Sequence, residues 1–76
     1  MEVHIAVKRR IEELLSEKNW SVNELSRQSN VNQSTISEIV SGRSKHPRII
    51  TLKKIAFAFN MSLSEFFNDE LFKNLK

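Results

Sequence analysis

The fold of this chain is decided by residues 20–42, which read WSVNELSRQSNVNQSTISEIVSG. Ser21 and Glu24 have the spacing of a capping box, in which the N-cap hydroxyl and the N3 carboxylate each accept a bond from the other residue's backbone N–H. Asn30 predicts the end of that helix, because asparagine is one of the few non-glycine residues that tolerate a left-handed backbone. The first half of the stretch therefore predicts a short helix between Ser21 and Asn30.

The same pattern starts again immediately after Asn30. Asn32 is the expected N-cap of a second helix, and Gly42 is its expected C-terminal stop. Ile36 and Ile39 form an i, i+3 pair on the inward face of this helix. Two helices joined by so short a turn cross steeply, with a small side chain at the close approach. This arrangement is a helix-turn-helix, whose second helix can enter the major groove of DNA.

The remaining sequence also predicts helices. Apolar residues at helical spacing indicate a first helix over about residues 5–18, although residues 3–5 alternate and are also compatible with an extended arm. Thr51 is the expected N-cap of a fourth helix, and Ser62 with Glu65 repeats the capping box for a fifth. All the predicted contacts are local, which is typical of an all-α domain.

Length and composition restrict the class of protein. The chain has 76 residues, enough for one domain, and the apolar stripe that continues into residues 68–76 allows one more helical turn there. With no cysteine, and with His4 and His46 far apart, the sequence offers neither disulfides nor a zinc site. No apolar run approaches the roughly 20 residues that span a bilayer, and no signal peptide opens the chain. We expect a cytoplasmic five-helix domain over residues 1–76 that binds no metal, cofactor or membrane and lacks the acid–base constellation of an enzyme.

Charge is unevenly distributed along the chain. The formal net charge is +3, and the acids lie mostly before residue 18 and after residue 64. Between Ser41 and Ile55 the chain carries cationic residues and one histidine but no acid: Arg43, Lys45, His46, Arg48, Lys53 and Lys54. A basic stripe directly after a candidate recognition helix suits the phosphates of nucleic acid. The alternative is a solvated loop with no fixed partner.

Several ordered segments carry a resemblance to a known family. They are SVNELS from Ser21, VNQSTIS from Val31, SGR from Ser41, and LKKIA through MSLSEFF from Leu52. Over about residues 11–67 the chain resembles the Cro- and phage-repressor-type helix-turn-helix domains, the lambda-repressor-like or XRE group. The resemblance implies sequence-specific binding of double-stranded DNA by a small transcriptional regulator, a repressor, with the third helix in the major groove. An antitoxin or another protein-interaction module on the same fold is the alternative function.

Two positions depart from the family pattern. The family usually opens its second helix with a glutamine that reaches a DNA phosphate, whereas Val22 stands there and cannot donate. Asn23 or Ser21 would then be the substitute donor. Several relatives also bury an arginine of helix 1 against a glutamate of helix 3, and the matching positions here are Leu15 and Val40. Because a packed apolar pair is often as stable as a buried ion pair, we expect these two residues to pack together.

The resemblance assigns roles to the exposed face of the third helix and to the loop after it. Base-edge contacts fall to Gln33, Ser34, Ser37 and Glu38. Gln33 has the best chemistry because its amide can bond N6 and N7 of adenine, whereas Glu38 either accepts from cytosine N4 or remains a solvated acid. Phosphate contacts fall to Asn23, Thr35, Ser41, Arg43, Lys45 and Arg48. Thr35 is equally suited to a structural place in the first turn of the helix.

The tail is the predicted site of self-association. One recognition helix contacts few bases, and dimers of this motif place two such helices about 34 Å apart on pseudo-palindromic half-sites. The apolar residues of the fifth helix and the tail predict a homodimer, weak in the absence of DNA, through Phe66, Phe67, Leu71 and Phe72. The alternative is that the tail folds back and caps the monomer. We expect Trp20 and most of the phenylalanines to belong to the core rather than to a base-stacking surface.

Overall fold

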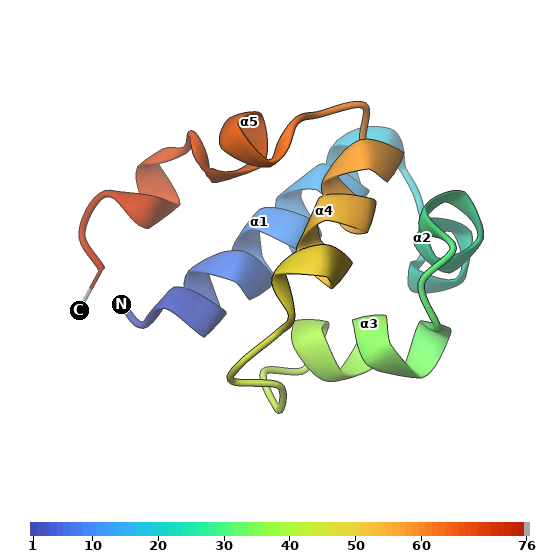
Figure 1. Cartoon of the computed structure of the whole chain (residues 1–76), viewed down its shortest axis with the longest axis horizontal. Coiled ribbons are helices and arrows are strands. Elements are labelled where there is room, and N and C mark those ends of the chain that lie inside the picture. The colour runs from blue at the N-terminus through green and yellow to red at the C-terminus, as the bar shows by residue number, and fades with distance from the viewer. Residues whose placement is uncertain (76) are drawn as a thin grey trace.

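The computed structural model describes residues 1–75, and within this range it contains five α-helices, one 3-10 turn and no strand. In chain order the elements are α1 (Val3–Lys18), α2 (Val22–Ser29), α3 (Gln33–Val40), α4 (Ile49–Ala58), α5 (Leu63–Phe67) and η1 (Glu70–Phe72). Figure 1 shows α2 and α3 at one side of the molecule and α5 with the tail at the other, with α1 and α4 between them. None of these helices is long and apolar enough to cross a membrane. The predicted all-α, five-helix fold is confirmed, including the extra turn in the tail, while Lys76 lies outside the described residues.

The core forms where the inward faces of the five helices meet. Each helix contributes at least one large side chain that is 0% exposed: Ile11, Leu25, Ile36, Ile55 and Phe66. Burial of a side chain of this size stabilises a fold by about 1.5–3 kcal/mol relative to its exposure, so every helix has an anchor of its own. Trp20, between α1 and α2, stacks on Phe59 with ring centroids 5.4 Å apart. Trp20 is half-buried and packs against the core, so it belongs with the core residues rather than with a base-stacking surface.

Asparagine residues stand at the C-terminal ends of three helices. Asn19, Asn30 and Asn60 follow α1, α2 and α4 with φ of 58°, 58° and 64°, all in the left-handed region. The predicted end of α2 at Asn30 is confirmed. Gly42, with φ of 84°, ends the turn after α3 in a conformation that glycine adopts without steric cost. These residues reverse the chain sharply and keep the connections short.

The starts of α1 and α4 differ from the sequence predictions. α1 begins at Val3, so residues 3–5 are helical rather than an extended arm. α4 begins at Ile49 with Arg48 as its N-cap residue, and the prediction of Thr51 as the cap is wrong. The reason is that the Arg48 carbonyl already accepts from the Leu52 N–H at 3.1 Å. The first helical turn is therefore closed around Thr51 instead of starting from it.

A buried arginine ties the C-terminal tail to α1. Arg10 is 7% exposed, and its guanidinium donates to the carbonyl oxygens of Phe66 at 2.7 Å and Glu65 at 3.1 Å. It also pairs with the Asp69 carboxylate at 3.1 Å. These acceptors satisfy a group that is costly to bury without partners. The tail therefore lies back against the helices in the manner of a cap.

Apolar residues occupy the two positions that correspond to the buried ion pair of several phage repressors. Leu15 is 9% exposed and belongs to the core, and Val40 is half-buried and packs against the same core. The helices that carry them, α1 and α3, are in contact. The buried arginine of this chain is instead Arg10, and its partner is in the tail rather than in α3.

Candidate nucleic-acid interface

Serine hydroxyls hold the turn between α2 and α3. Ser26 donates to the Val31 carbonyl at 2.6 Å. The buried Ser29 donates to the Leu25 carbonyl at 2.6 Å and accepts from the Val31 N–H at 3.3 Å. Because these polar groups of the turn bond one another, the turn holds α3 at a fixed angle to α2. The helix-turn-helix predicted over residues 20–42 is thus present in the structure.

α3 presents a polar face to solvent. Asn32 caps the helix by accepting from the Ser34 N–H at 2.9 Å, as predicted, and the Ser34 hydroxyl donates to the same oxygen at 2.7 Å. Among the predicted contact residues of this helix, three are exposed and two are half-buried: Gln33, Ser34 and Glu38, then Thr35 and Ser37. The Ser34 hydroxyl is already engaged in the cap. Among the three exposed residues, Gln33 therefore has a side chain with both a donor and an acceptor group that the cap does not use.

The N-terminus of α2 forms only half of the predicted capping box. Ser21 accepts from the Glu24 N–H at 3.0 Å. The Glu24 carboxylate, however, accepts from Gln28 at 2.8 Å and pairs with Arg27 instead of returning to Ser21. The bond from Gln28, and then that from Arg27, holds the pKa of Glu24 below its usual value. Partners one turn further along the helix have thus displaced the predicted contact.

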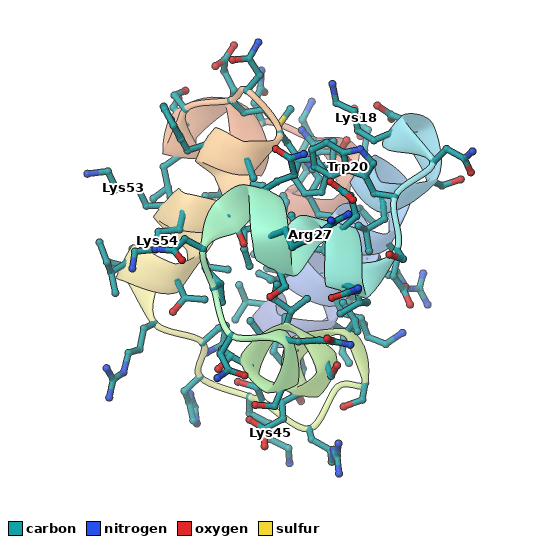
Figure 2. All side chains as sticks on the ribbon, turned by 90° about the vertical axis from the view of Figure 1, so that its right-hand side faces the viewer. Lys18, Trp20, Arg27, Lys45, Lys53 and Lys54 are labelled. Atoms are coloured by element: carbon teal, nitrogen blue, oxygen red, sulfur yellow. The ribbon has the colours of Figure 1, made fainter. Side chains whose placement is uncertain are left out.

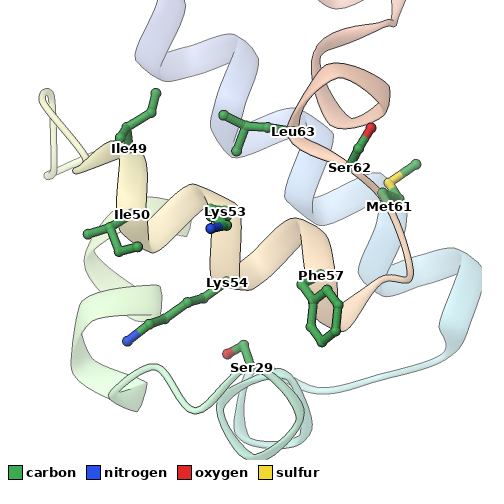
Figure 3. A pocket seen from close by; sticks show the side chains of 9 residues that line it. All are labelled: Ser29, Ile49, Ile50, Lys53, Lys54, Phe57, Met61, Ser62 and Leu63. Carbon is green, nitrogen blue, oxygen red and sulfur yellow. The ribbon is translucent and has the colours of Figure 1, made fainter.

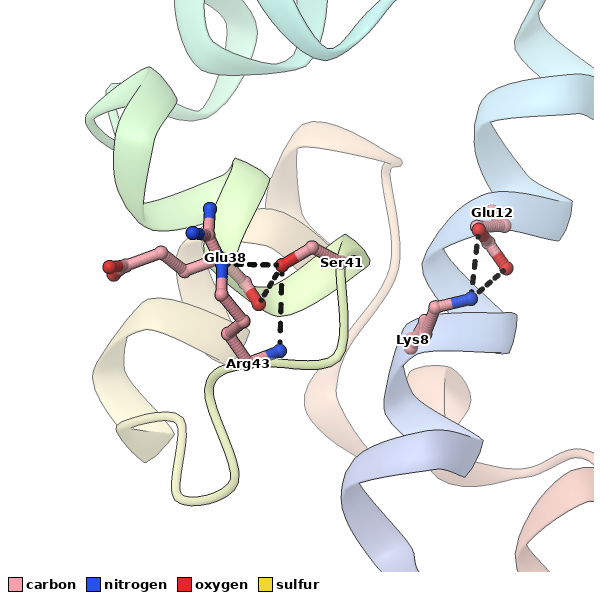
Figure 4. A network of polar contacts seen from close by, with 5 residues as sticks. All are labelled: Lys8, Glu12, Glu38, Ser41 and Arg43. Atoms are coloured by element: carbon pink, nitrogen blue, oxygen red, sulfur yellow. Dashed lines mark hydrogen bonds and ion pairs between the residues drawn. The ribbon is translucent and has the colours of Figure 1, made fainter.

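A small polar network joins the end of α3 to the loop that follows (Figure 4). The Ser41 hydroxyl donates to the Glu38 carbonyl at 3.1 Å and accepts from Arg43 Nε at 3.3 Å. The Arg43 N–H donates to the same carbonyl at 3.1 Å. Figure 4 shows the Glu38 carboxylate pointing away from this network. The backbone and the first part of the Arg43 side chain are therefore held beside α3, while its charge remains exposed.

The other residues predicted to contact phosphate lie on adjoining elements. Lys45 and Arg48 are exposed in the loop, and Asn23 is exposed at the start of α2. Thr35 and Arg48 line a hollow of about 360 Å³ between α3 and the loop. Val22, at the position where the family has a glutamine, is half-buried against the core. Cations and short polar groups from α2, α3 and the loop are thus available around the exposed face of α3.

The basic stripe of the sequence divides into two groups in space. Figure 2 shows Lys45 beneath α3, whereas Lys53 and Lys54 project from α4 at the side of the molecule. Lys53 and Lys54 line a separate apolar groove, and neither Lys45 nor Arg43 contributes to it. The loop cations alone adjoin the face of α3, and the α4 lysines belong to a different surface.

The outer face of α4 is an exposed apolar surface that the motifs of the sequence do not predict. Ile49 is 66% exposed, Ile50 is 49% exposed and Phe57 is 80% exposed. Phe57 is thus a phenylalanine outside the core, in which most of the phenylalanines are expected. The helical spacing of these residues indicates the exposed face, because Ile49, Lys53 and Phe57 follow one another at i, i+4 and i+8 and so lie on one side of α4. Their face is opposite to that of the buried Ile55.

The residues predicted to form a dimer contact are largely engaged within the monomer. Phe66 is 0% exposed and offers a partner no surface, so its assignment to the contact is wrong. Phe67 and Phe72 pack edge to face with centroids 4.9 Å apart. These two residues and Leu71 are half-buried. The predicted contact is reduced to the parts of these three side chains that remain exposed.

The fold and this face define a helix-turn-helix DNA-binding domain, and comparison with known proteins agrees. The family model of the Cro/C1-type HTH DNA-binding domain matches residues 10–71. The chain belongs to this family, whose members bind DNA and regulate transcription. The crystal structure of the prophage Lp1 protein 11 is similar, with a TM-score of 0.82 and 28% sequence identity over 99% of this chain and 100% of that one. Among curated proteins, none matches.

Proposed function

We propose that this chain represses transcription by binding specific sequences of double-stranded DNA, with α3 in the major groove. The observation that carries the proposal is the exposed polar face of α3, held at a fixed angle by the paired turn before it. The major groove is about 12 Å wide and admits a helix. The cationic loop lies next to this helix and suits the phosphates that border the groove.

Base recognition rests chiefly on Gln33. Its exposed amide can donate to N7 and accept from N6 of one adenine, a pairing that discriminates against other bases by about 1–3 kcal/mol. Glu38 is exposed and its carboxylate points away from the protein, so it can accept from cytosine N4. Ser34 and Ser37 supply short contacts, because one is committed to the helix cap and the other is half-buried.

Phosphate binding rests on the loop cations and on neighbouring polar groups. Arg43 is held by Ser41 before DNA arrives, and it therefore loses less side-chain freedom on binding than an unrestrained arginine. Lys45 and Arg48 add exposed charge. The remaining contacts assigned to phosphates are short polar side chains at helix ends: Asn23, Thr35 and Ser41.

Two copies bind one pseudo-palindromic site in this proposal. A single α3 has eight residues, and a second copy one DNA turn away doubles the number of bases contacted. The exposed parts of Phe67, Leu71 and Phe72 provide the contact between copies. Since these side chains are half-buried in the monomer, association in solution is weak and is completed on DNA.

Selection of bound duplexes from a randomised pool tests the proposed function. We expect enrichment of an inverted repeat whose half-sites are about 10 base pairs apart. Affinity for the selected duplex should exceed that for a scrambled duplex of the same composition by about 1,000-fold or more. Failure to enrich any motif, with equal affinity for all duplexes at each salt concentration, would contradict sequence-specific binding.

A further inference from the structure

The groove on the outer face of α4 is large, apolar and separate from the proposed DNA site. Its volume is about 540 Å³. The apolar part of its lining is Ile49, Ile50, Phe57, Met61 and Leu63. Figure 3 shows these side chains arranged along α4 and the start of α5, with Lys53 and Lys54 between them and Ser29 facing them from α2. None of the residues assigned to DNA lines the groove.

Folding does not account for the apolar residues on this face. The inward side of α4 already fills the core with Leu52, Ile55 and Phe59, each 4% exposed or less. Ile49 and Phe57 nevertheless remain 66% and 80% exposed on the opposite side. Keeping such area in water is unfavourable by about 25 cal/mol per Å². A contiguous patch of this kind marks an interaction site.

The charge around the groove identifies the partner's chemistry. Lys53 and Lys54 are both exposed and border the apolar walls. None of the nine lining residues is acidic. The ion pairs among residues 1–75 involve other cations, such as Lys8 with Glu12 and Lys73 with Glu70. A ligand that fits both features has an apolar face with carboxylates beside it.

The shape of the groove fits a helix of about two to three turns. The walls extend along α4 from Ile49 to Phe57, a rise of about 12 Å at 1.5 Å per residue. An amphipathic helix binds such a groove with apolar side chains at i, i+3 or i+4, and i+7. We propose that this groove binds an acidic amphipathic helix of a partner protein. The proposal does not depend on the DNA site, because the two surfaces share no residue.

A second copy of this chain fits the groove less well. A two-fold interface places the same patch on both subunits. Lys53 and Lys54 would then face their own counterparts, with no carboxylate in the lining to offset the repulsion. An acidic partner instead pairs with both lysines while Phe57 is buried. Charge complementarity therefore favours a different protein over self-association.

A set of three synthetic helical peptides tests this inference on the intact chain. The first has an apolar stripe flanked by glutamates, the second has lysine in place of every glutamate, and the third has the first peptide's composition in scrambled order. Each carries a fluorophore, and binding is measured by anisotropy, with backbone amide NMR shifts to locate the site. We expect the acidic amphipathic peptide to bind at least about tenfold more tightly than either control and to shift residues of α4 and the start of α5.

Variants of the protein separate the two features of the groove. Phe57→Ser should weaken binding of the acidic peptide by about tenfold or more, as expected for a large aromatic anchor that is exposed in the free protein. The double variant Lys53→Glu, Lys54→Glu should weaken it similarly and improve binding of the lysine peptide. Arg9→Glu, a single charge reversal at an exposed position of α1, is the control for charge reversal outside the groove and should change affinity by less than about twofold.

Three results would overturn the inference. They are equal binding of the acidic and lysine peptides, NMR shifts outside the groove, and full affinity in Phe57→Ser. Sedimentation equilibrium of the chain alone tests whether a second copy of the chain occupies the groove. A dimer that Phe57→Ser abolishes would show that a second copy occupies the groove. All of these measurements are made without DNA, so their outcome is distinguishable from failure of the proposed DNA binding.

Discussion

Phe57 and Phe66 belong to consecutive helices and have opposite environments. Phe66 of α5 is 0% exposed, whereas Phe57 of α4 is 80% exposed. Phe66 lies beneath Arg10, whose guanidinium carbon is 5.8 Å from the ring centroid. Phe57 instead lines the groove beside Lys53 and Lys54. The contrast shows that apolar residues of the C-terminal half have two uses: Phe66, pointing inward from α5, stabilises the monomer, and the residues of outer α4 are available to another molecule.

The largest expected effect is the loss of stability when Phe66 is truncated, and truncation of Phe57 is its matched control. Phe66→Ala should lower the free energy of unfolding by about 3–5 kcal/mol, because it leaves a cavity in the core where α5 packs against α4. Phe57→Ala should change it by less than about 0.5 kcal/mol, as for other surface substitutions. Urea titration followed by circular dichroism measures both values. Similar losses of stability in the two variants would contradict the assignment of Phe66 to the core and of Phe57 to an exposed surface.

Loss of the tail's anchor should have the next largest effect. Arg10→Ala leaves the Glu65 and Phe66 carbonyls and the Asp69 carboxylate without their donor. Removal of one partner from a buried charge network costs about 3 kcal/mol or more. Lys53→Ala, which removes an exposed cation of α4, is the matched control and should be nearly neutral. A melting temperature for Arg10→Ala close to that of the control would contradict the anchoring role.

The sequence predicts the helix-turn-helix well because its signals are local. The cap at Asn32 and the end of α2 at Asn30 each depend on a few neighbouring residues, and both are confirmed. The partners of Arg10 lie more than 50 residues away in the chain, and no local pattern indicates them. Nor does the spacing of Glu24 from Ser21 show that Gln28 and Arg27 compete for its carboxylate.

The candidate site is predictable in part for the same reason. Exposure of Gln33 and Glu38 follows from the inward phase of Ile36 and Ile39. The separation of the α4 lysines from the loop cations does not follow from the charge pattern, because it depends on the direction in which α4 leaves the loop. The exposure of Phe57 can be predicted from its spacing along the helix, but its residue type alone favours burial.

Acid should have a smaller effect on the free energy of unfolding, and this effect arises at the start of α5, the helix that carries Phe66. Bonds from the Ser62 backbone N–H and then from its side chain hold the pKa of Glu65 below its usual value of 4.5. The ionised Glu65 carboxylate therefore stabilises the folded state at pH above 4.5, and this contribution is lost as the pH falls through the lowered folded-state pKa.

The matched variant for this effect is Glu65→Gln, which cannot ionise. Its stability relative to the wild type should be lowest at neutral pH, and the difference should shrink as the pH falls below 4.5. Urea unfolding at a series of pH values provides the measurement. A difference between the two proteins that is independent of pH would show that ionised Glu65 does not stabilise the start of α5.

In the proposed complex, α3 reads bases while the loop cations bind phosphates. Fluorescence anisotropy separates these two roles, with wild type, Gln33→Ala and Arg43→Ala each titrated against the selected and the scrambled duplex at several salt concentrations. Gln33→Ala should lose about 1–3 kcal/mol on the selected duplex and almost nothing on the scrambled one. Arg43→Ala should weaken binding to both duplexes and reduce the slope of log K against log salt by about one. An equal loss on both duplexes for Gln33→Ala would contradict the assignment of α3 as the helix that reads the bases.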